Sequence, residues 1–404
     1  MRSPYFFFRP FVSPQHGWLA FDFTAGAGGS PNVQDYLRCI KEANASSLGG
    51  MHPLIIPAKP AWIEQEGLVD SLEPRQAIYV MPPQVLESTA TLERCKKLLG
   101  HGYHLGIQVT GTDIVRQIPL TSFDHVSLSA AFAHDEMLAS DLKYIDDAGF
   151  RKIATGVNSH EVYGWLTAKG FELCQSAFLS TRNTASGRQP DLARLKLLKL
   201  LSIVERDGDT REIEAIFREE PKLSYNLLRL VNSVAVGART RISNFAQAIA
   251  ILGRRQLQRW LQLLIYANNL ADGNVPNPLM QTAAARGRLV ELLCKSIDLP
   301  PGNSELCDNA FMTGLFSLLD VLINLPMTDI LKELPLHDDV MIALQSPATG
   351  GTLGKLLTIV AHGEAGNFAA AEALLDEFDI SPETHAAAQV SALHWAAHIN
   401  VEKD

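Results

Sequence analysis

The chain has 404 residues, a formal net charge of −9, 47% hydrophobic residues and 20% charged residues. This composition is that of a globular protein and excludes long disordered segments. The acidic balance argues against a dedicated nucleic-acid-binding protein, which would usually be basic. A chain of this length is expected to form two domains of ordinary size.

Targeting and redox signals are weak. The five cysteines are Cys39, Cys95, Cys174, Cys294 and Cys307. This odd, unclustered set favours reduced thiols over a disulfide framework or a zinc site. The apolar N-terminus is interrupted by Arg9 and Pro10 too early for a signal-peptide core. The apolar segment Phe311–Leu325 is too short to span a bilayer. We therefore expect a soluble, cytoplasmic protein that does not enter the membrane.

The first half of the chain alternates strand-like and helical patterns. Strand-like runs occur at Tyr5–Phe8, Trp18–Phe23, Leu54–Ile56, Ala77–Met81, Leu105–Val109, His125–Leu128, Lys152–Ala154 and Phe171–Leu173. Helical patterns fill most gaps, at Val33–Ala43, Val85–Leu99, Asp135–Asp147 and His160–Lys169. This alternation predicts βαβ units and a parallel sheet. Eight strands favour closure into a TIM-like (β/α) barrel, with an open sheet as the alternative.

The C-terminal ends of the strands are where such barrels carry their chemistry. Apart from Asp22, the predicted ends are nearly devoid of carboxylates and hold no compact histidine cluster. Hydrolysis of a phosphodiester by divalent metals needs several hard oxygen ligands and a base. The required residue types are therefore missing where a metal centre would need them.

Two segments resemble the EAL domain, the barrel family that hydrolyses cyclic di-GMP. Residues 170–178 resemble its closing segment, and residues 153–159 resemble a stretch in which the family has two glutamates, replaced here by Thr155 and Asn158. The Glu-Ala-Leu signature falls near residues 21–23, so Asp22 would stand in for a metal-binding glutamate. The family's paired aspartates fall near residues 108–109, and the strand that should carry its catalytic lysine has none.

The resemblance covers roughly residues 1–180 and implies a degenerate EAL-like barrel without catalytic residues, metal or cofactor. It makes Asp22 and Gln175 candidate ligand-binding residues. The glycine-rich segment Gly26–Ser30 follows a strand and precedes a helix, as a phosphate-binding loop would. Pro31 replaces the third glycine and no lysine follows, which favours a flexible turn.

Residues 181–190 are polar and rich in helix breakers, so we place a linker there between domains 1–180 and 191–404. The second domain shows no convincing strand and is predicted to be all-helical. Within Glu219–Leu264, the segments 220–224, 227–233 and 242–253 are similar to the HDOD domain, a non-catalytic relative of the HD phosphohydrolases. Residues 311–320 resemble a later helix of that family. An EAL-like barrel followed by HDOD matches a bacterial signalling architecture.

Two histidine patterns have structural explanations. His337-Asp338 is an HD dipeptide, but no histidine lies between His160 and His337 to supply an upstream ligand. Its setting between Pro335 and a second aspartate favours a helix N-terminus. His394 and His398 are spaced to share a helix face, without a nearby third metal ligand.

The remaining candidates are polar residues of the HDOD-like segment. Arg229 and Asn232 lie one helical turn apart, and a structural role is the alternative to a partner contact. A basic patch, for which a solvated helix face is the alternative, is formed by Arg239, Arg241, Arg254, Arg255 and Arg259.

These features predict a non-catalytic signalling module that acts through protein–protein contacts. The expected partners are sensor kinases or diguanylate cyclases, or a second copy of the chain. The alternative is a receptor that binds cyclic di-GMP or another nucleotide without cleaving it. A third reading is a residual phosphodiesterase that uses Asp22.

Overall fold

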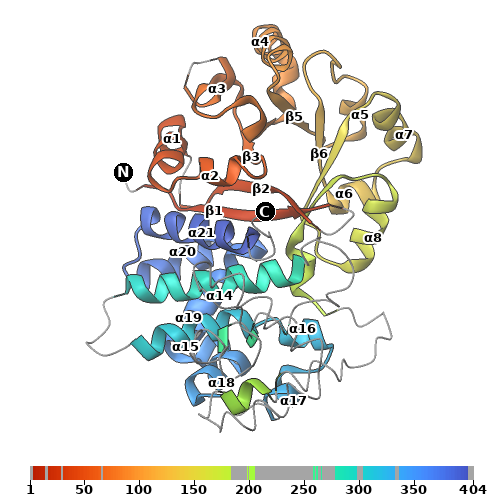
Figure 1. Cartoon of the computed structure of the whole chain (residues 1–404). Coiled ribbons are helices and arrows are strands. Elements are labelled where there is room, and N and C mark those ends of the chain that lie inside the picture. Colours follow the sequence, from red (N-terminus) through yellow and green to blue (C-terminus); the bar gives the residue numbers. More distant parts are fainter. Residues whose placement is uncertain are drawn as a thin grey trace, which may run out of the picture.

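A computed structural model shows a β/α barrel joined to a helical region (Figure 1). It describes residues 3–13, 17–28, 31–64, 67–182, 198, 200–204, 258, 259, 261, 262, 265, 278–297, 304–332 and 336–398.

The strands form a closed barrel in the order β1-β2-β3-β4-β5-β6-β7-β8, as the pattern predicts. They are β1 (Phe6–Val12), β2 (Trp18–Ala25), β3 (Leu54–Pro57), β4 (Ala77–Met81), β5 (His104–Gln108), β6 (His125–Ser129), β7 (Arg151–Thr155) and β8 (Leu173–Gln175). Strand β1 is antiparallel to both β2 and β8, and all other neighbours are parallel.

The last strand begins two residues later than predicted. The Phe171 N–H donates to the Leu166 carbonyl at 3.1 Å, so Phe171 still belongs to the turn that ends the preceding helix. Gly170 makes this turn possible with φ +73°, a left-handed conformation that favours glycine.

Helices and 3-10 turns surround the barrel. They are α1 (Val33–Glu42), α2 (Ser46–Gly49), α3 (Pro60–Glu64), η1 (Val69–Ser71), η2 (Pro74–Gln76), η3 (Pro83–Glu87), α4 (Thr89–Gly100), α5 (Thr112–Val115), α6 (Ala130–Asp135), α7 (Ala139–Asp147), α8 (His160–Ala168) and η4 (Ser176–Ser180). The hydroxyls of Ser88, Ser129 and Ser159 accept hydrogen bonds from the first turns of α4, α6 and α8. Such N-caps end the preceding segment, which is why α4 starts four residues after the predicted Val85.

Apolar side chains fill the barrel interior. They come from alternate positions along the strands and point to the same face of the sheet. They are Phe11, Ala20, Ile55, Ile78, Val80, Ile153 and Leu173. A much larger apolar cluster lies between the strands and the outer helices. The barrel is therefore a packed core and not a pore.

The described part of the second half is helical, as predicted. Its elements are α14 (Pro278–Ser296), α15 (Ser304–Phe316), α16 (Leu319–Ile323), α17 (Met327–Lys332), α18 (Asp338–Gln345), η6 (Pro347–Thr349), α19 (Gly351–Ala365), α20 (Phe368–Glu377) and α21 (Pro382–Ala397). Among the described residues, Leu306–Ile323 is long and apolar enough to cross a membrane, but 67% of it is buried in the protein, as in a core helix.

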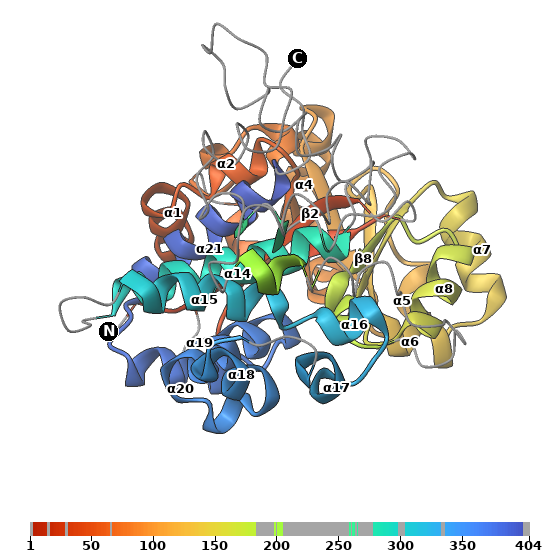
Figure 2. The same cartoon turned by 60° about the horizontal axis from the view of Figure 1, so that its bottom comes forward.

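Helix α21 covers the outer face of β1. It lies beside α1 and α2 in both views (Figures 1 and 2). Its residues Ala386, Val390, Leu393 and Ala396 join the apolar cluster of the barrel. Strand β1 runs directly into β2 without a crossover helix, so the C-terminal helix supplies the cover that a helix after β1 would otherwise give.

One side chain of α21 completes the backbone hydrogen bonding of β1. The buried Gln389 donates from Nε2 to the Phe6 carbonyl at 2.8 Å and accepts the Phe8 N–H at Oε1 at 3.1 Å. Strand β8 pairs with β1 only at Phe11 and Val12, so this part of the β1 edge has no strand neighbour on that side. The amide of Gln389 takes the place of a neighbouring strand.

We expect Gln389→Leu to lower the free energy of unfolding by about 2–4 kcal/mol, because it leaves a buried N–H and a buried carbonyl without partners. Chemical denaturation would measure the change. Ser391→Ala, at an exposed position of the same helix, is the control and should change stability by less than about 0.5 kcal/mol. Equal stability of the two variants would contradict the role of Gln389.

Candidate functional site at the barrel mouth

Asp22 on β2 is the one carboxylate within the eight described strands. It lies toward the C-terminal end of β2, directly opposite Arg9 of β1 in the register. Its side chain is 9% exposed. The barrel mouth thus has a single acidic group within its strands, as the sequence predicts.

Three side chains contact the Asp22 carboxylate with hydrogen-bond donors. The Arg9 Nε donates to Oδ2 at 2.9 Å and the Arg9 Nη2 donates to the same oxygen. The Thr24 hydroxyl donates to Oδ1 at 2.6 Å. The Gln175 Nε2 lies 3.3 Å from Oδ2. A guanidinium bound to the carboxylate places a positive charge where a metal ion would have to bind, which disfavours a cation there.

Gln175 links Asp22 to the neighbouring strand end. Its Oε1 accepts the Gly156 N–H at 2.9 Å while its Nε2 faces Asp22. The structure therefore brings together the two candidate ligand-binding residues, although they are separated by 153 positions in the chain. Their binding of a ligand stays a prediction.

The helical region packs against this side of the mouth. The Phe7 ring stacks on Phe368 of α20 with centroids 4.5 Å apart, and the Arg9 guanidinium lies 5.0 Å from the same ring. A Cβ on Gly26 would lie 1.7 Å from Glu372 Oε1. The segment predicted to be a flexible turn is thus packed closely against the helical region. The nearby Glu372 carboxylate disfavours phosphate binding there.

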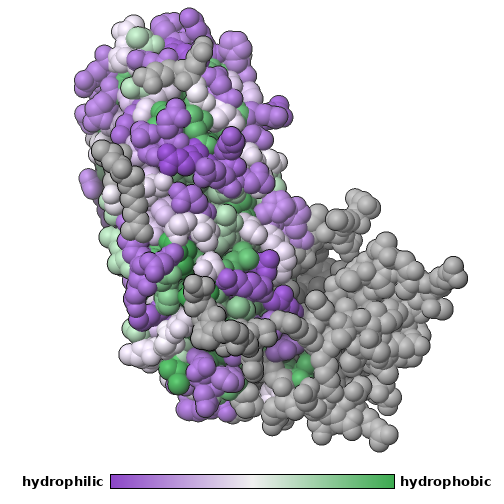
Figure 3. All heavy atoms as spheres, turned by 90° about the vertical axis from the view of Figure 1, so that its left-hand side faces the viewer, coloured by the Kyte–Doolittle hydropathy of each residue, from purple (hydrophilic) through white to green (hydrophobic). Residues whose placement is uncertain are grey.

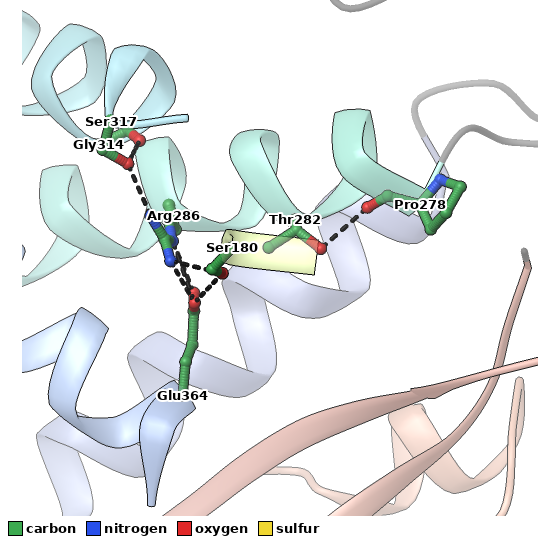
Figure 4. A network of polar contacts seen from close by, with 7 residues as sticks. All are labelled: Ser180, Pro278, Thr282, Arg286, Gly314, Ser317 and Glu364. Carbon is green, nitrogen blue, oxygen red and sulfur yellow. Dashed lines mark hydrogen bonds and ion pairs between the residues drawn. The ribbon is translucent and has the colours of Figure 1, made fainter. Parts of the chain in front are cut away.

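A partly buried ion-pair network fastens the end of the barrel to the helical region (Figure 4). Arg286 of α14 donates from Nε to both oxygens of Glu364 on α19, at 2.9 and 3.0 Å. Its Nη2 reaches Ser180 of η4 at 2.8 Å, and its Nη1 reaches Ser317 after α15 at 3.0 Å. The Arg286 side chain is 7% exposed and that of Glu364 is 25% exposed.

The two networks line one cavity of about 50 Å³ between the barrel and the helical region. Its polar lining includes Arg9, Gln175, Arg286, Glu364 and Gln389, and its walls include Phe7, Trp18 and Ile359. A cavity of this size admits water or a small group and does not admit a dinucleotide. Sequence reasoning missed Arg286 and Gln389, because nothing local distinguishes them from surface residues of amphipathic helices.

Removal of one partner of the buried pair should be costly. We expect Arg286→Ala to lower the free energy of unfolding by about 3–5 kcal/mol, because Glu364 would lose its counter-charge. The exposed pair Lys355–Glu377 is the control, and Lys355→Ala should cost less than about 1 kcal/mol. Urea denaturation measures both variants. A loss below 1 kcal/mol for Arg286→Ala would contradict this assignment.

A His–Asp–His cluster that the sequence pattern did not indicate lies at the opposite end of the barrel. His104 Nδ1 lies 2.6 Å and His125 Nδ1 2.8 Å from the Asp124 carboxylate, which also accepts the Leu105 N–H at 2.8 Å. Burial by itself would raise the pKa of Asp124, but these hydrogen bonds outweigh it and hold the pKa well below its usual range. The three residues are of types that bind metals, and their candidate ligand atoms lie within 4.8 Å of one another. Their contacts join β5 to β6.

The other histidines take structural positions. His337 is the N-cap of α18, and its ring accepts the Asp339 N–H at 3.4 Å, which confirms the helix N-terminus predicted for the HD dipeptide. His394 of α21 and His398, the C-cap residue of that helix, have ring centroids 4.5 Å apart.

Of the predicted interaction residues, the structure describes Arg259. Its Nη2 donates to the buried Glu291 at 2.7 Å, and its guanidinium lies 4.7 Å from the Phe311 ring. Arg229, Asn232, Arg239, Arg241, Arg254 and Arg255 lie outside the described residues. The interaction role of the whole set stays a prediction.

Glu291 is a buried carboxylate with a shifted pKa. Burial alone would raise the pKa, but hydrogen bonds from Lys295, Arg259 and Arg288 lower it from 4.5 to about 2. A carboxylate with a lower pKa in the folded state stabilises the fold above its unfolded pKa and loses that contribution as the pH falls. Its contribution is therefore complete above about pH 5 and decreases toward about pH 2.

We expect the stability difference between the wild type and Glu291→Gln to be largest near neutral pH and to shrink on acidification, because the wild-type carboxylate becomes protonated. Thermal unfolding of both proteins across this range measures the difference. Glu377→Gln, at an exposed position, is the control. A difference between the wild type and Glu291→Gln that is independent of pH would contradict the shifted pKa.

Parts of this chain are similar to known proteins. Residues 192–333 match the HDOD domain. The uncharacterized protein YuxH of Bacillus subtilis is 24% identical over 285 residues, covering 69% of this chain and 68% of YuxH. Cyclic di-GMP phosphodiesterase CdgJ of Vibrio cholerae is 25% identical over 251 residues, covering 62% of this chain and 56% of CdgJ.

Solved structures with similarity to this chain include EAL domains. The EAL domain of Mycobacterium smegmatis DcpA has a TM-score of 0.35 at 16% identity, covering 43% of this chain and 88% of that domain. The EAL domain of Xanthomonas citri FimX, in complex with c-diGMP, has a TM-score of 0.35 at 12% identity, covering 44% and 86%.

The predicted HDOD domain is confirmed by the family match, and the predicted barrel by its closed strand order. The matched range ends at residue 333, whereas the predicted second domain runs from 191 to 404. The exact domain bounds stay predictions.

Proposed function

We propose that this chain, an EAL-like barrel followed by an HDOD domain, is a non-catalytic signal-transduction module that acts through protein–protein contacts. The observation that carries the proposal is the pairing of Asp22 with Arg9 at the barrel mouth. Two-metal or one-metal phosphodiester hydrolysis needs several hard oxygen ligands around an open position. Here Asp22, the one carboxylate within the described strands, is already bound by the Arg9 guanidinium.

The relatives support a place in cyclic di-GMP signalling. CdgJ is named a cyclic di-GMP phosphodiesterase, and the FimX EAL domain was solved in complex with c-diGMP. We infer that this chain keeps the barrel architecture of such proteins and uses it as a support for the HDOD domain. Sensor kinases, diguanylate cyclases or a second copy of the chain in the cytoplasm are the partners that we propose.

The distribution of surface residues is consistent with docking through polar and mixed contacts. On the face in Figure 3, hydrophobic residues are interspersed with hydrophilic ones over the described atoms. Among the described residues, the exposed large apolar side chains are Leu19, Leu120, Leu138 and Ile342. A partner surface of this composition would resemble a transient interface.

A receptor for cyclic di-GMP or another nucleotide is the alternative. It is favoured by the proximity of Asp22 and Gln175 at the barrel mouth and by the contact of Arg9 with Phe368 of the helical region. A ligand that displaced Arg9 from Asp22 would change a contact with the helical region and shift its packing. The small size of the cavity is the observation against it.

The hydrolysis test uses purified full-length chain, cyclic di-GMP, and Mg²⁺ or Mn²⁺, with CdgJ assayed in parallel. We expect no linear dinucleotide product from this chain at enzyme concentrations at which CdgJ completes the reaction. Asp22→Asn should leave this background unchanged. Metal-dependent cleavage that disappears in Asp22→Asn would overturn the proposal in favour of a residual phosphodiesterase.

Calorimetric titration with cyclic di-GMP distinguishes the module from the receptor. The module should show no saturable binding, whereas a receptor should bind with a Kd below about 10 μM, which corresponds to about −7 kcal/mol. Arg9→Ala should strengthen binding to a receptor if Arg9 blocks the mouth. The control is Arg116→Ala, an exposed arginine that pairs with Asp141. Saturable binding by the wild type would favour the alternative.

A further inference from the structure

Two cysteines that no sequence motif links lie side by side in the structure. Cys294 is in the last turn of α14 and Cys307 is in the first turn of α15. Their Sγ atoms are 3.7 Å apart. Cys294 is fully buried, and Cys307 is partly exposed and open to small oxidants.

The register of the two helices explains this contact. A Cβ on Gly314 of α15 would lie 2.6 Å from the Arg286 carbonyl, and one on Gly287 of α14 would lie 2.9 Å from the Phe311 carbonyl. These glycines allow the two backbones to touch. Because the helices are antiparallel, the backbones remain close along the same seam toward the end at which the cysteines meet.

The spacing places the cysteines on that seam. Cys294 follows Gly287 by seven residues, and Cys307 precedes Gly314 by seven. Seven residues are about two helical turns, so each cysteine faces the same way as the glycine of its helix. The register of the two helices therefore brings the two thiols together, and their contact does not depend on a single side-chain rotamer.

We propose that Cys294 and Cys307 are an oxidative modification site, which forms an intramolecular disulfide between α14 and α15 on reaction with a peroxide. A disulfide needs sulfur atoms about 2.0 Å apart, so rotation of the two side chains has to close the remaining gap. This site is independent of the proposed signalling function.

The chemistry is balanced with hydrogen peroxide as the oxidant. The Cys307 thiolate attacks a peroxide oxygen, which gives the sulfenic acid and, with one proton, water. The Cys294 sulfur then attacks the sulfenic sulfur, and its proton leaves with the hydroxyl as a second water. Two thiols are oxidised to one disulfide, and one peroxide is reduced to two waters. A dithiol reductant reverses the step.

The surroundings of Cys294 set the rate and the consequence of this reaction. Burial raises the pKa of Cys294 to about 12, so we expect the second step to be slow near neutral pH and faster in alkaline solution. The cross-link would fix α15 to the helix that carries Arg286, whose network holds Ser180 at the end of the barrel. Oxidation would thereby stiffen the anchor between the two parts of the chain.

The test is thiol counting and peptide mapping of the full-length chain, reduced and then treated with hydrogen peroxide. After denaturation, the count of free thiols should fall from five to three, because two of the cysteines are consumed. Mass spectrometry should find the peptides of Cys294 and Cys307 linked, with a loss of about 2 Da. Dithiothreitol should restore all five thiols.

Matched variants make the assignment specific. We expect the cross-link to raise the melting temperature of the wild type. Cys307→Ser, with Cys307→Ala as a second variant, should abolish both the cross-link and this rise. Cys95→Ser, at a buried cysteine of the barrel, should still form the cross-link. Linkage between two chains, sulfinic acid at Cys307 with free Cys294, or an unchanged thiol count in the wild type would each overturn the proposal.

Discussion

The structure depends on the burial of one strand edge. Strand β1 is antiparallel to its neighbours and leads directly into β2, so it lacks both a crossover helix and, along Phe6–Phe8, a strand partner on one side. An open edge of this kind invites pairing with other chains. Helix α21 covers it with apolar side chains, and Gln389 satisfies its backbone groups. Helix α21 therefore completes the backbone hydrogen bonding and the apolar cover of β1.

This dependence explains why the helical region lies at the barrel mouth. With α21 along β1, the neighbouring helices bring Phe368 against Phe7 and Arg9, and they bring Glu364 to Arg286 and Ser180. The Asp22 network and the Arg286 network line the same cavity. Residues of both networks therefore lie at the boundary between the barrel and the helical region.

Local patterns predicted the elements well and their contacts poorly. Ala77–Met81 was predicted to the residue, because a buried strand carries its own apolar run. The helix N-terminus at His337 followed from local charge and proline signals. The Cys294–Cys307 contact and the His104–Asp124–His125 cluster were not predicted, since neither pairing has a spacing signal of its own. Two of the cysteines that are scattered in the sequence form a close thiol pair in the structure.

The sequence by itself determined the alternation of strands and helices in the first half, the helical character of the described part of the second half, and the scarcity of carboxylates in the strands, because periodicity and residue type are local properties. Tertiary structure alone decided that Asp22 binds Arg9, that Gln389 completes β1, and that Arg286 joins α14 to the barrel. Arg286 and Ser180 are separated by 106 positions, and Gln389 and Phe6 by 383. Contacts at such separations depend on how whole elements pack, which no local pattern encodes.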